Sequence, residues 1–333
     1  MAQSQYPLSR ILVYPGDGIG IDTVREAMKV LETLNRLMNL NIQLEEVDWG
    51  MRYYARTGKV CPPDFIEQIK QRCDCVFLGA LGDPSKLPDH VTLKPLIDMR
   101  QRLDQYICNR PAKLLPGLSS PLVNIQNGID IVVVRENSEG EYSYAGGRLK
   151  PGQKDEVALE VAIHTRKGVE RVLRYAFELA RSRPRKILTM ATKSNALKSG
   201  MVMWDEIGKL VAQEYPDVKW ERKHIDALSM EIVVNPGRFD VIVASNLFGD
   251  ILSDLCGGIS GSLGMAPSAN INPERKYPSM FEPVHGSAPD IMGLGIANPL
   301  GAIRAVAMML DFMGRKTAAE VLEKVIIDNL LHG

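Results

Sequence analysis

Residues 10–38 read RILVYPGDGIGIDTVREAMKVLETLNRLM, and this stretch decides the fold class. It opens with a short apolar strand from Arg10 to Tyr14, followed by a glycine-rich turn from Pro15 to Gly20. Residues 21–38 then carry apolar side chains at helical spacing, so that they share one face. A strand that leads through a tight turn into a helix is the repeating unit of parallel α/β sheets. We therefore expect an α/β fold.

The rest of the chain repeats this alternation. We expect further strands at 41–47, 75–78, 129–134, 187–190 and 239–244, and a half-exposed strand at 157–163. We expect helices starting at 63, over 168–180, within 193–215 and, as a pair, over 301–331. Residues 257–298 are rich in Gly, Pro, Ser and Asn. A connection of that length is uncommon in a compact domain unless it has a function, so we expect this segment to be functional.

Composition excludes several classes of protein. The 333 residues are 45% hydrophobic and 24% charged, with 40 basic and 40 acidic side chains, so no basic excess favours nucleic-acid binding. No apolar run reaches the roughly 18 residues of a membrane span, and no signal-peptide pattern opens the chain. The five cysteines have irregular spacings, which is typical of reduced thiols. We expect a cytoplasmic protein that binds neither membrane nor nucleic acid.

The glycine-rich turn allows two interpretations. It joins a strand to a helix, where a helix N-terminus can hold a phosphate, or it is a tight structural turn. The spacing is not the G-x-G-x-x-G of a dinucleotide fold, and no G-x-x-x-x-G-K-[ST] motif occurs. The sequence gives no support for a Rossmann or P-loop site.

Carboxylates form a stronger signal. Asp250 and Asp254 lie four residues apart and would share one face of a helix. Their like charges repel unless a cation lies between them. With Asp226 upstream, three hard oxygen ligands would suit Mg²⁺ or Mn²⁺ rather than zinc. The alternative is a solvated helix face, which the apolar neighbours of Asp250 make less attractive.

Arginines form a second cluster. Arg100, Arg110 and Arg135 lie near predicted strand ends, and Arg135 directly follows an apolar strand. Guanidinium groups bind carboxylates with two hydrogen bonds, and Tyr142 nearby could donate a proton. For any single arginine the alternative is a surface salt bridge.

Taken together, these residues resemble the isocitrate, isopropylmalate and tartrate dehydrogenase family of β-decarboxylating dehydrogenases, from Pro15 to about Met309. The motifs that carry the resemblance are GDGIG at 16–20, the Arg100 and Arg110 pair, REN at 135–137, TK at 192–193, Asp250 with Asp254, EPVHGSAPD at 282–290 and ANP at 297–299. The phrases RENSEGEYS at 135–143 and ASNLFGDILSD at 244–254 look most like the tartrate and D-malate subgroup.

The resemblance implies a two-domain α/β fold that is not of the Rossmann type, with the active-site cleft between the domains. Residues 1–105 plus 261–333 would form a large cofactor-binding domain, and residues 106–260 a smaller domain for substrate and dimerisation. The protein would work as a homodimer or a dimer of dimers. The implied reaction is NAD-dependent oxidation, usually with decarboxylation, of a 2-hydroxy diacid of the D-malate or tartrate type, assisted by Mn²⁺ or Mg²⁺ and with K⁺ as a further cation.

The resemblance also assigns roles to individual residues. Arg100, Arg110 and Arg135 would bind the substrate carboxylates. Asp250 and Asp254 would hold the metal together with Asp226 of the partner subunit. Lys193, also from the partner, would take the hydroxyl proton, and Tyr142 would protonate the enolate. The NAD-binding set would be Glu282, His285, Gly286, Ser287, Ala288, Asp290 and Asn298.

Asp290 bears on the choice of cofactor. At this position of the family a carboxylate would accept hydrogen bonds from the adenosine ribose and repel the 2′-phosphate of NADP. The alternative is that Asp290 only caps the turn at 291–293.

Two other functions remain open. Leu96 and Ile97 could contact an apolar substituent, and segment 92–99 departs from the tartrate-type pattern, so a 3-isopropylmalate or other branched-malate dehydrogenase is an alternative. A non-catalytic regulatory subunit is a second one, but it would lack a metal aspartate, the lysine or the tyrosine, and this chain keeps all of them. The chain ends at Gly333, before the closing segment of most relatives, which we expect to be disordered or trimmed.

Overall fold

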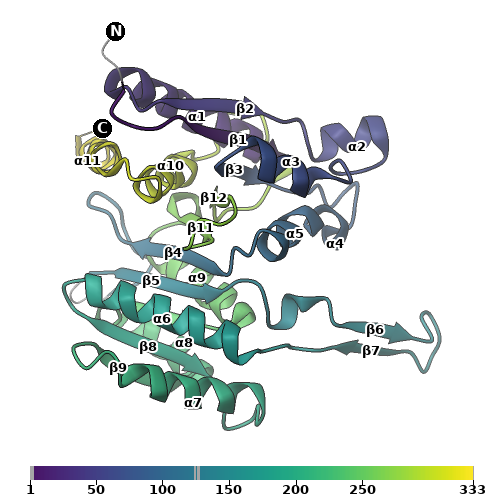
Figure 1. Ribbon diagram of the computed structural model, residues 1–333, viewed down its shortest axis with the longest axis vertical. Helices are drawn as coiled ribbons and strands as arrows, with labels where there is room; N and C mark the ends of the chain where they lie inside the picture. Colours follow the sequence, from purple (N-terminus) through teal and green to yellow (C-terminus); the bar gives the residue numbers. More distant parts are fainter. Residues whose placement is uncertain (1–3, 124, 126–127, 333) are drawn as a thin grey trace. The chain divides into compact units, whose positions relative to one another are not determined.

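The computed structural model describes residues 4–123, 125 and 128–332. The chain divides into two compact units (Figure 1). The first unit consists of Met1–Gln105, Leu114–Pro121 and Ser260–Gly333, and the second of Tyr106–Lys113 and Leu122–Ile259. In the described part of the chain, no helix is both long and apolar enough to cross a membrane.

The first unit is built on five neighbouring strands. Their order is β2 (Ile42–Glu46), β1 (Ser9–Gly16), β3 (Cys75–Ala80), β12 (Ser279–Pro283) and β11 (Pro267–Ile271). The first four run parallel, and β11 is antiparallel to β12. The helices of this unit are α1 (Ile19–Met38), α2 (Met51–Thr57), α3 (Phe65–Arg72), α4 (Asp89–Thr92), α5 (Lys94–Arg102), α10 (Leu300–Phe312) and α11 (Lys316–His332).

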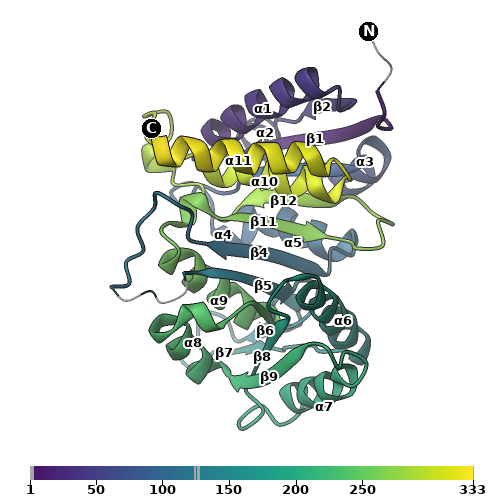
Figure 2. The ribbon, with the colours of Figure 1, turned by 90° about the vertical axis from the view of Figure 1, so that its left-hand side faces the viewer.

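Alternation along the strands gives this sheet two buried faces. Leu12 and Tyr14 of β1 share one face with Val76 and Leu78 of β3, and this cluster also contains Met99 of α5. On the other side α1 and α10 pack against each other and against the strands, and Figure 2 shows α10 and α11 running along the sheet. A strand covered on both faces reads as a continuous apolar run, which explains CVFLGA in β3.

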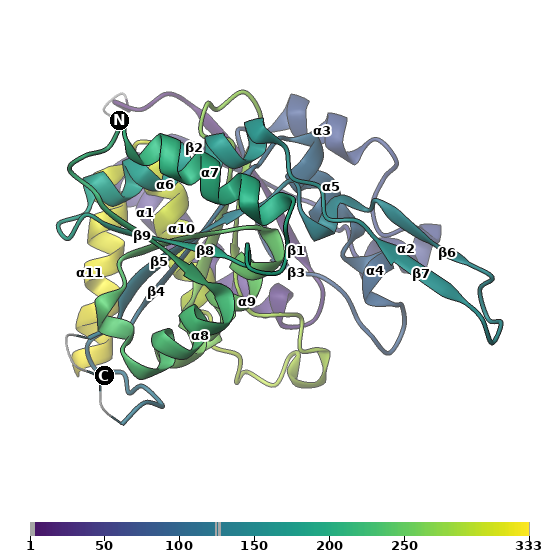
Figure 3. The same ribbon diagram turned by 90° about the horizontal axis from the view of Figure 1, so that it is seen from below.

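The second unit repeats the design with different helices. Its strand order is β4 (Ile107–Lys113), β5 (Asp130–Glu136), β10 (Val241–Ala244), β8 (Ile187–Thr192) and β9 (Lys219–His224), with β4 antiparallel to β5 and the others parallel. Its helices are α6 (Arg166–Ser182), α7 (Gly200–Ala212), α8 (Ile225–Val234) and α9 (Asn246–Ile259). A hairpin of β6 (Gly146–Leu149) and β7 (Val157–Glu160) projects from this unit (Figure 3).

Two sequence-based expectations were wrong in detail. Residues 157–163 do not form a half-exposed strand of the main sheet, because β7 pairs only with β6 and all four of its residues are exposed. Residues 257–298 are not one connection, since they contain the end of α9 and the strands β11 and β12. Some of the Gly and Pro in that stretch lie in the turns between these elements, and others lie within the helix and the strands.

Candidate active site

The glycine-rich turn between β1 and α1 is a structural turn. The backbone N–H groups of Asp17, Ile19, Gly20 and Ile21 already donate to carbonyls of Ala80, Ser287, Asp17 and Gly18, respectively. The Asp17 carboxylate accepts from the N–H groups of Met51 at 2.7 Å and Gly82 at 2.8 Å. Gly18 has φ +55°, and a Cβ there would lie 1.9 Å from the Ser287 carbonyl oxygen. These donors are therefore not available to a phosphate, and the turn instead supports the loop that contains Ser287.

Arg135 stands at the carboxyl end of β5 and is fixed by α9. Its side chain is 1% exposed. The Nε and Nη2 atoms donate to Asn246 Oδ1 at 3.0 and 2.6 Å, and Nη1 donates to Asp250 Oδ1. Asn246 in turn donates to the Glu139 carbonyl at 2.8 Å. Asn246 thus fixes the plane of the guanidinium. Sequence patterns did not select Asn246, although its position just after the buried strand β10 could have indicated a site residue.

Asp250 is the centre of a hydrogen-bonded cluster in the second unit. Its Oδ1 also accepts from Arg110 Nη1 at 3.1 Å, and its Oδ2 accepts from the Tyr142 hydroxyl at 2.9 Å. Arg110 donates further to Ser253 Oγ at 2.9 Å and lies 3.4 Å from Asp254. The structure therefore brings together two of the three predicted substrate arginines, the predicted proton donor and two of the three predicted metal ligands.

The surroundings of the Asp254 carboxylate are compatible with a bound cation. Partial burial raises the pKa of Asp254; Arg110 lowers this pKa, and the neighbouring Asp250 raises it. A bound divalent cation would remove that penalty on the charged form. Two carboxylates on one helix face supply hard oxygen ligands, so the residues present fit part of a Mg²⁺ or Mn²⁺ shell.

Asp226 and Lys193 lie apart from this cluster in the second unit. Lys193 Nζ, after β8, donates to Asp226 Oδ1 in the first turn of α8 at 2.7 Å. This contact lowers the pKa of Asp226. Across the described ranges 4–123, 125 and 128–332, no three His, Cys, Asp or Glu side chains converge on a common point. A single chain therefore does not bring Asp226 to Asp250 and Asp254.

Arg100, the third predicted substrate arginine, lies in the first unit. Arg100 contacts a residue that was predicted to bind the cofactor. Its Nη2 atom lies 3.2 Å from Glu282 Oε1, and both side chains are buried. Asn270 Nδ2 donates to the same oxygen at 2.7 Å. The sequence did not single out Asn270, which lies on β11 next to β12. Glu282 is thus held by two donors at the carboxyl end of β12.

The loop after β12 contains a polar atom without a partner. His285 Nδ1 lies 2.9 Å from the Gly286 carbonyl oxygen, whereas its buried Nε2 has no hydrogen-bond partner. Burial lowers the pKa of His285, with Gly286 and Glu282 acting in the opposite direction. A Cβ on Gly286 would meet nothing within 4 Å. A buried nitrogen without a partner in the predicted cofactor loop is compatible with a ligand that brings a polar group.

The cofactor candidates Ala288, Asp290 and Asn298 lie further along this loop. Asp290, in the short 3₁₀ turn Pro289–Ile291, is exposed and makes no hydrogen bond to the turn at 291–293. The Gly293 N–H donates to Asp22 instead, at 2.7 Å. The capping alternative for Asp290 is therefore wrong. Asn298 accepts from the N–H of Leu300 at 3.0 Å, which helps to start α10.

Comparison with known proteins places this geometry in a family. Residues 10–333 match the family described as isocitrate/isopropylmalate dehydrogenase. The chain belongs to this family. A solved isocitrate dehydrogenase from Methylococcus capsulatus superposes with a TM-score of 0.88 at 37% identity, covering 98% of this chain and 92% of that one. The predicted α/β fold of the isocitrate/isopropylmalate dehydrogenase type, distinct from the Rossmann fold, is confirmed.

Curated relatives lie in the tartrate and D-malate subgroup that the sequence indicated. The chain is 51% identical over 308 residues to the D-malate dehydrogenase (decarboxylating) of Escherichia coli (strain K12), covering 92% of this chain and 85% of the relative. It is 48% identical over 310 residues to the tartrate dehydrogenase/decarboxylase of Pseudomonas putida, with the same coverage. Membership of this dehydrogenase family makes the chain an oxidoreductase.

Proposed function

We propose that the protein oxidises and decarboxylates a 2-hydroxy diacid of the D-malate or tartrate type, with NAD as the oxidant and a divalent metal as the Lewis acid. The observation that carries this proposal is the convergence of Arg110, Arg135 and Tyr142 on Asp250. Two guanidinium groups, one phenol and a carboxylate pair suit an anionic substrate that loses a carboxylate. The names of the two curated relatives support the same substrate class.

The two arginines of the cluster bind and orient the substrate. Guanidinium groups pair with carboxylates through parallel hydrogen bonds. Arg135 is held rigidly by Asn246, so little side-chain entropy is lost when the substrate binds. Arg110 is shared between Asp250, Ser253 and Asp254 and can turn one N–H toward a substrate oxygen. Arg100 is the third carboxylate ligand in this proposal.

Proton transfers fall to Tyr142 and Lys193. The Tyr142 hydroxyl is held by Asp250 and delivers a proton to the carbon that the carboxylate leaves. Lys193 of the partner subunit takes the proton of the 2-hydroxyl. Asp250 and Asp254, with Asp226 of the partner subunit, would hold the cation, which polarises the hydroxyl and then the ketone.

The loop from Glu282 to Asn298 binds NAD. His285 Nε2 is a buried polar atom without a partner, and a side chain at Gly286 would meet nothing within 4 Å. Asp290 offers an exposed carboxylate to the ribose hydroxyls. NAD provides the hydride acceptor, while these residues position it.

The active protein is a homodimer or a dimer of dimers. Apolar side chains stand exposed on the β6–β7 hairpin, where Leu149 is 59% and Leu159 is 53% exposed. Others stand on α8, where Met230 is 60% and Val234 is 71% exposed. Such surface is covered in stable assemblies. A second copy would also supply Lys193 and Asp226 to each site.

Turnover with a panel of substrates tests the proposal. D-malate, L-tartrate, 3-isopropylmalate and isocitrate are each incubated with NAD and Mn²⁺, and NADH and released carbon dioxide are measured together. We expect kcat/KM to be highest for D-malate or tartrate, with equal yields of the two products and loss of activity on metal chelation. Highest kcat/KM with 3-isopropylmalate would favour the branched-malate alternative, and no turnover with any of the four would favour the regulatory one.

A further inference from the structure

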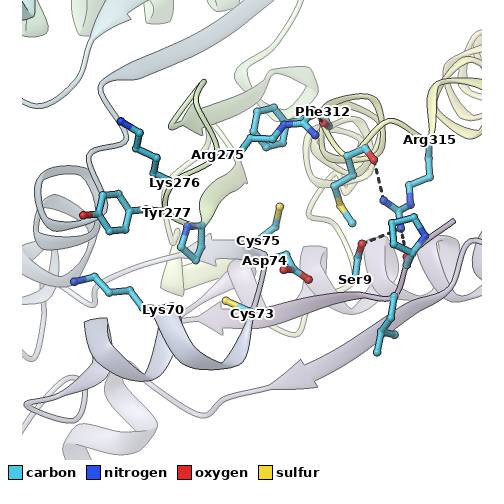
Figure 4. Close-up of a pocket in the computed structure, with 14 residues that line it drawn as sticks. Ser9, Lys70, Cys73, Asp74, Cys75, Arg275, Lys276, Tyr277, Phe312 and Arg315 are labelled. Carbon is cyan, nitrogen blue, oxygen red and sulfur yellow. Dashed lines mark hydrogen bonds between the residues drawn. The ribbon is translucent and has the colours of Figure 1, made fainter.

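A basic pocket lies in the first unit, at the end of the sheet opposite the cofactor loop. It encloses about 420 Å³ next to the amino ends of β1, β3 and β12 (Figure 4). These three strands run parallel. Their carboxyl ends lead to the Gly16–Gly18 turn and to Glu282, so the pocket and the predicted cofactor loop lie at opposite ends of the same strands. Nothing in the proposed reaction uses it.

Positive charge dominates the walls of the pocket. Lys70, Arg275, Lys276 and Arg315 line it, and Asp74 is the single acidic residue among the lining residues. In Figure 4, Lys70, Lys276 and Tyr277 lie on one side and Arg315 on the other, with Asp74 between them. The Asp74 carboxylate is partly engaged, since it accepts from the Arg10 N–H at 2.8 Å. The whole chain has equal numbers of basic and acidic residues, so this local excess is a feature of the pocket.

Arg315 is a buried cation without a carboxylate. Arg315 is 2% exposed, and no Asp or Glu oxygen in the described residues lies within 4.0 Å of its guanidinium. Nη1 and Nη2 donate to carbonyls and to Ser9 Oγ at 2.8 Å, while the buried Nε has no acceptor. Burial lowers the pKa of Arg315, while Tyr6, Cys75 and the more distant Asp74 act in the opposite direction. A buried charge that is not neutralised is costly unless a counter-charge binds nearby.

Lys276, in contrast, is exposed. Its ammonium forms no hydrogen bond or ion pair with any residue that the structure describes, although its backbone N–H donates to Asn272 at 2.8 Å. Lys70 is different, because it pairs with Glu67 at 3.0 Å and lies 5.5 Å from the Tyr277 ring centre. Arg275 donates to the Phe312 carbonyl. Lys276 is therefore free to meet a ligand.

Capping of a helix explains only part of this arrangement. Arg275 and Arg315 donate to the Phe312 and Met313 carbonyls at the end of α10, where cations offset the helix dipole. That role does not require Lys276, and it leaves Arg315 Nε without an acceptor.

We propose that this pocket binds a small, multiply charged oxyanion, carried by a phosphate ester or a polycarboxylate. Its volume lies in the range of small-molecule sites. Lys276 forms the primary charge contact, and Arg315 on the opposite wall adds to the positive charge of the pocket. Binding at this end of β12 is independent of the substrate and NAD proposed above.

Calorimetric titration of the full chain tests the proposal, with pyrophosphate and citrate as separate probes at constant ionic strength. We expect one probe to bind with a stoichiometry of one per chain. Lys276→Gln should weaken that binding by about fivefold or more, the value of one lost charge-assisted contact. The matched control is Lys324→Gln, an exposed lysine on α11 of the same unit, which should leave the affinity unchanged.

The pattern across the two variants decides the outcome. Pyrophosphate binding that depends on Lys276 identifies a phosphate site, and citrate binding with the same dependence identifies a carboxylate site. No heat with either probe, or equal affinity of wild type and Lys276→Gln, overturns the proposal, because a probe held elsewhere does not sense Lys276. Arg315 is unsuited to this test, since it anchors Pro7 and Ser9 and its loss would disturb the fold.

Discussion

At the scale of single residues, Asp250 shows how this site is held ready before any ligand arrives. Its two oxygens accept from Arg110, Arg135 and Tyr142. The carboxylate thus keeps three functional side chains in place while satisfying their charges and donors. A substrate carboxylate can then replace one contact at a time, so no buried charge is left without a partner.

Asp290 should determine the choice between NAD and NADP. Its exposed carboxylate can accept from ribose hydroxyls and would repel a 2′-phosphate. We expect kcat/KM for NAD to exceed that for NADP by about a hundredfold, as close charge pairs allow. Asp290→Ala should remove most of this preference, because the variant would bind NAD more weakly and would no longer repel the 2′-phosphate of NADP. Equal kcat/KM for the two cofactors in wild type, or an unchanged ratio in the variant, would contradict this role.

His285 should make stability depend on pH. Burial lowers the pKa of His285 in the folded protein, whereas the unfolded chain titrates near its ordinary value of about 6.5. Below that pH the unfolded state binds more protons, so the free energy of unfolding should fall as the pH drops toward the folded pKa. Urea unfolding at several pH values measures this for wild type and for His285→Gln, which does not titrate. The prediction fails if the difference between the two proteins is the same at about pH 5.5 and about pH 8.

Sequence patterns selected several residues that lie together in the structure, but they did not indicate how these residues are held. Asp250, Arg110, Arg135 and Tyr142 were all selected from residue type and spacing, and the structure brings them together. Asn246 was missed because an amide has many roles, and only the register of α9 on β5 shows that it meets Arg135. The pairing of Arg100 with Glu282 depends on contacts 182 residues apart in the chain, which no local pattern reports.

At the scale of elements, α9 connects the fold to the site. A Cβ on Gly249 would lie 2.6 Å from the Cβ of Arg135, so glycine permits close approach of the helix to β5. Strands β1, β3, β5 and β8 and helices α1 and α6 were predicted, because their periodicity is strong. Strands β4 and β9 and helix α8 were missed. β9 reads KWERKH with no buried residue and follows neither simple pattern.

Two glycines of α9 form a matched pair for a stability test. Gly249→Ala should cost about 1–3 kcal/mol, because the methyl group forces helix and strand apart. Gly258→Ala, where a Cβ meets nothing within 4 Å, should be neutral or stabilise by about 0.5–1 kcal/mol through helix propensity. Urea unfolding at one protein concentration measures both. Similar effects of the two substitutions would show that close packing at Gly249 is unimportant.

At the scale of the whole molecule, the separation of Lys193 and Asp226 from Asp250 points to sites shared between two chains. Lys193→Ala and Asp250→Asn should each be inactive alone. In a mixed dimer one of the two sites would combine an intact Lys193 with an intact Asp250. Random assembly should therefore recover about a quarter of the wild-type activity. Co-expression with two affinity tags isolates the mixed dimer, and an inactive mixed dimer would rule out sharing.

The exposed hairpin has a consequence for the lifetime of the protein. Lys150 and Lys154 lie in the turn between β6 and β7 and are exposed, and such loop tips are where proteases cut first. If a second copy covers the hairpin, mass action sets the fraction of chains that trypsin can reach. Dilute protein would be cut quickly at this tip and concentrated protein slowly. Cleavage at one short turn would then report the assembly state of the entire enzyme.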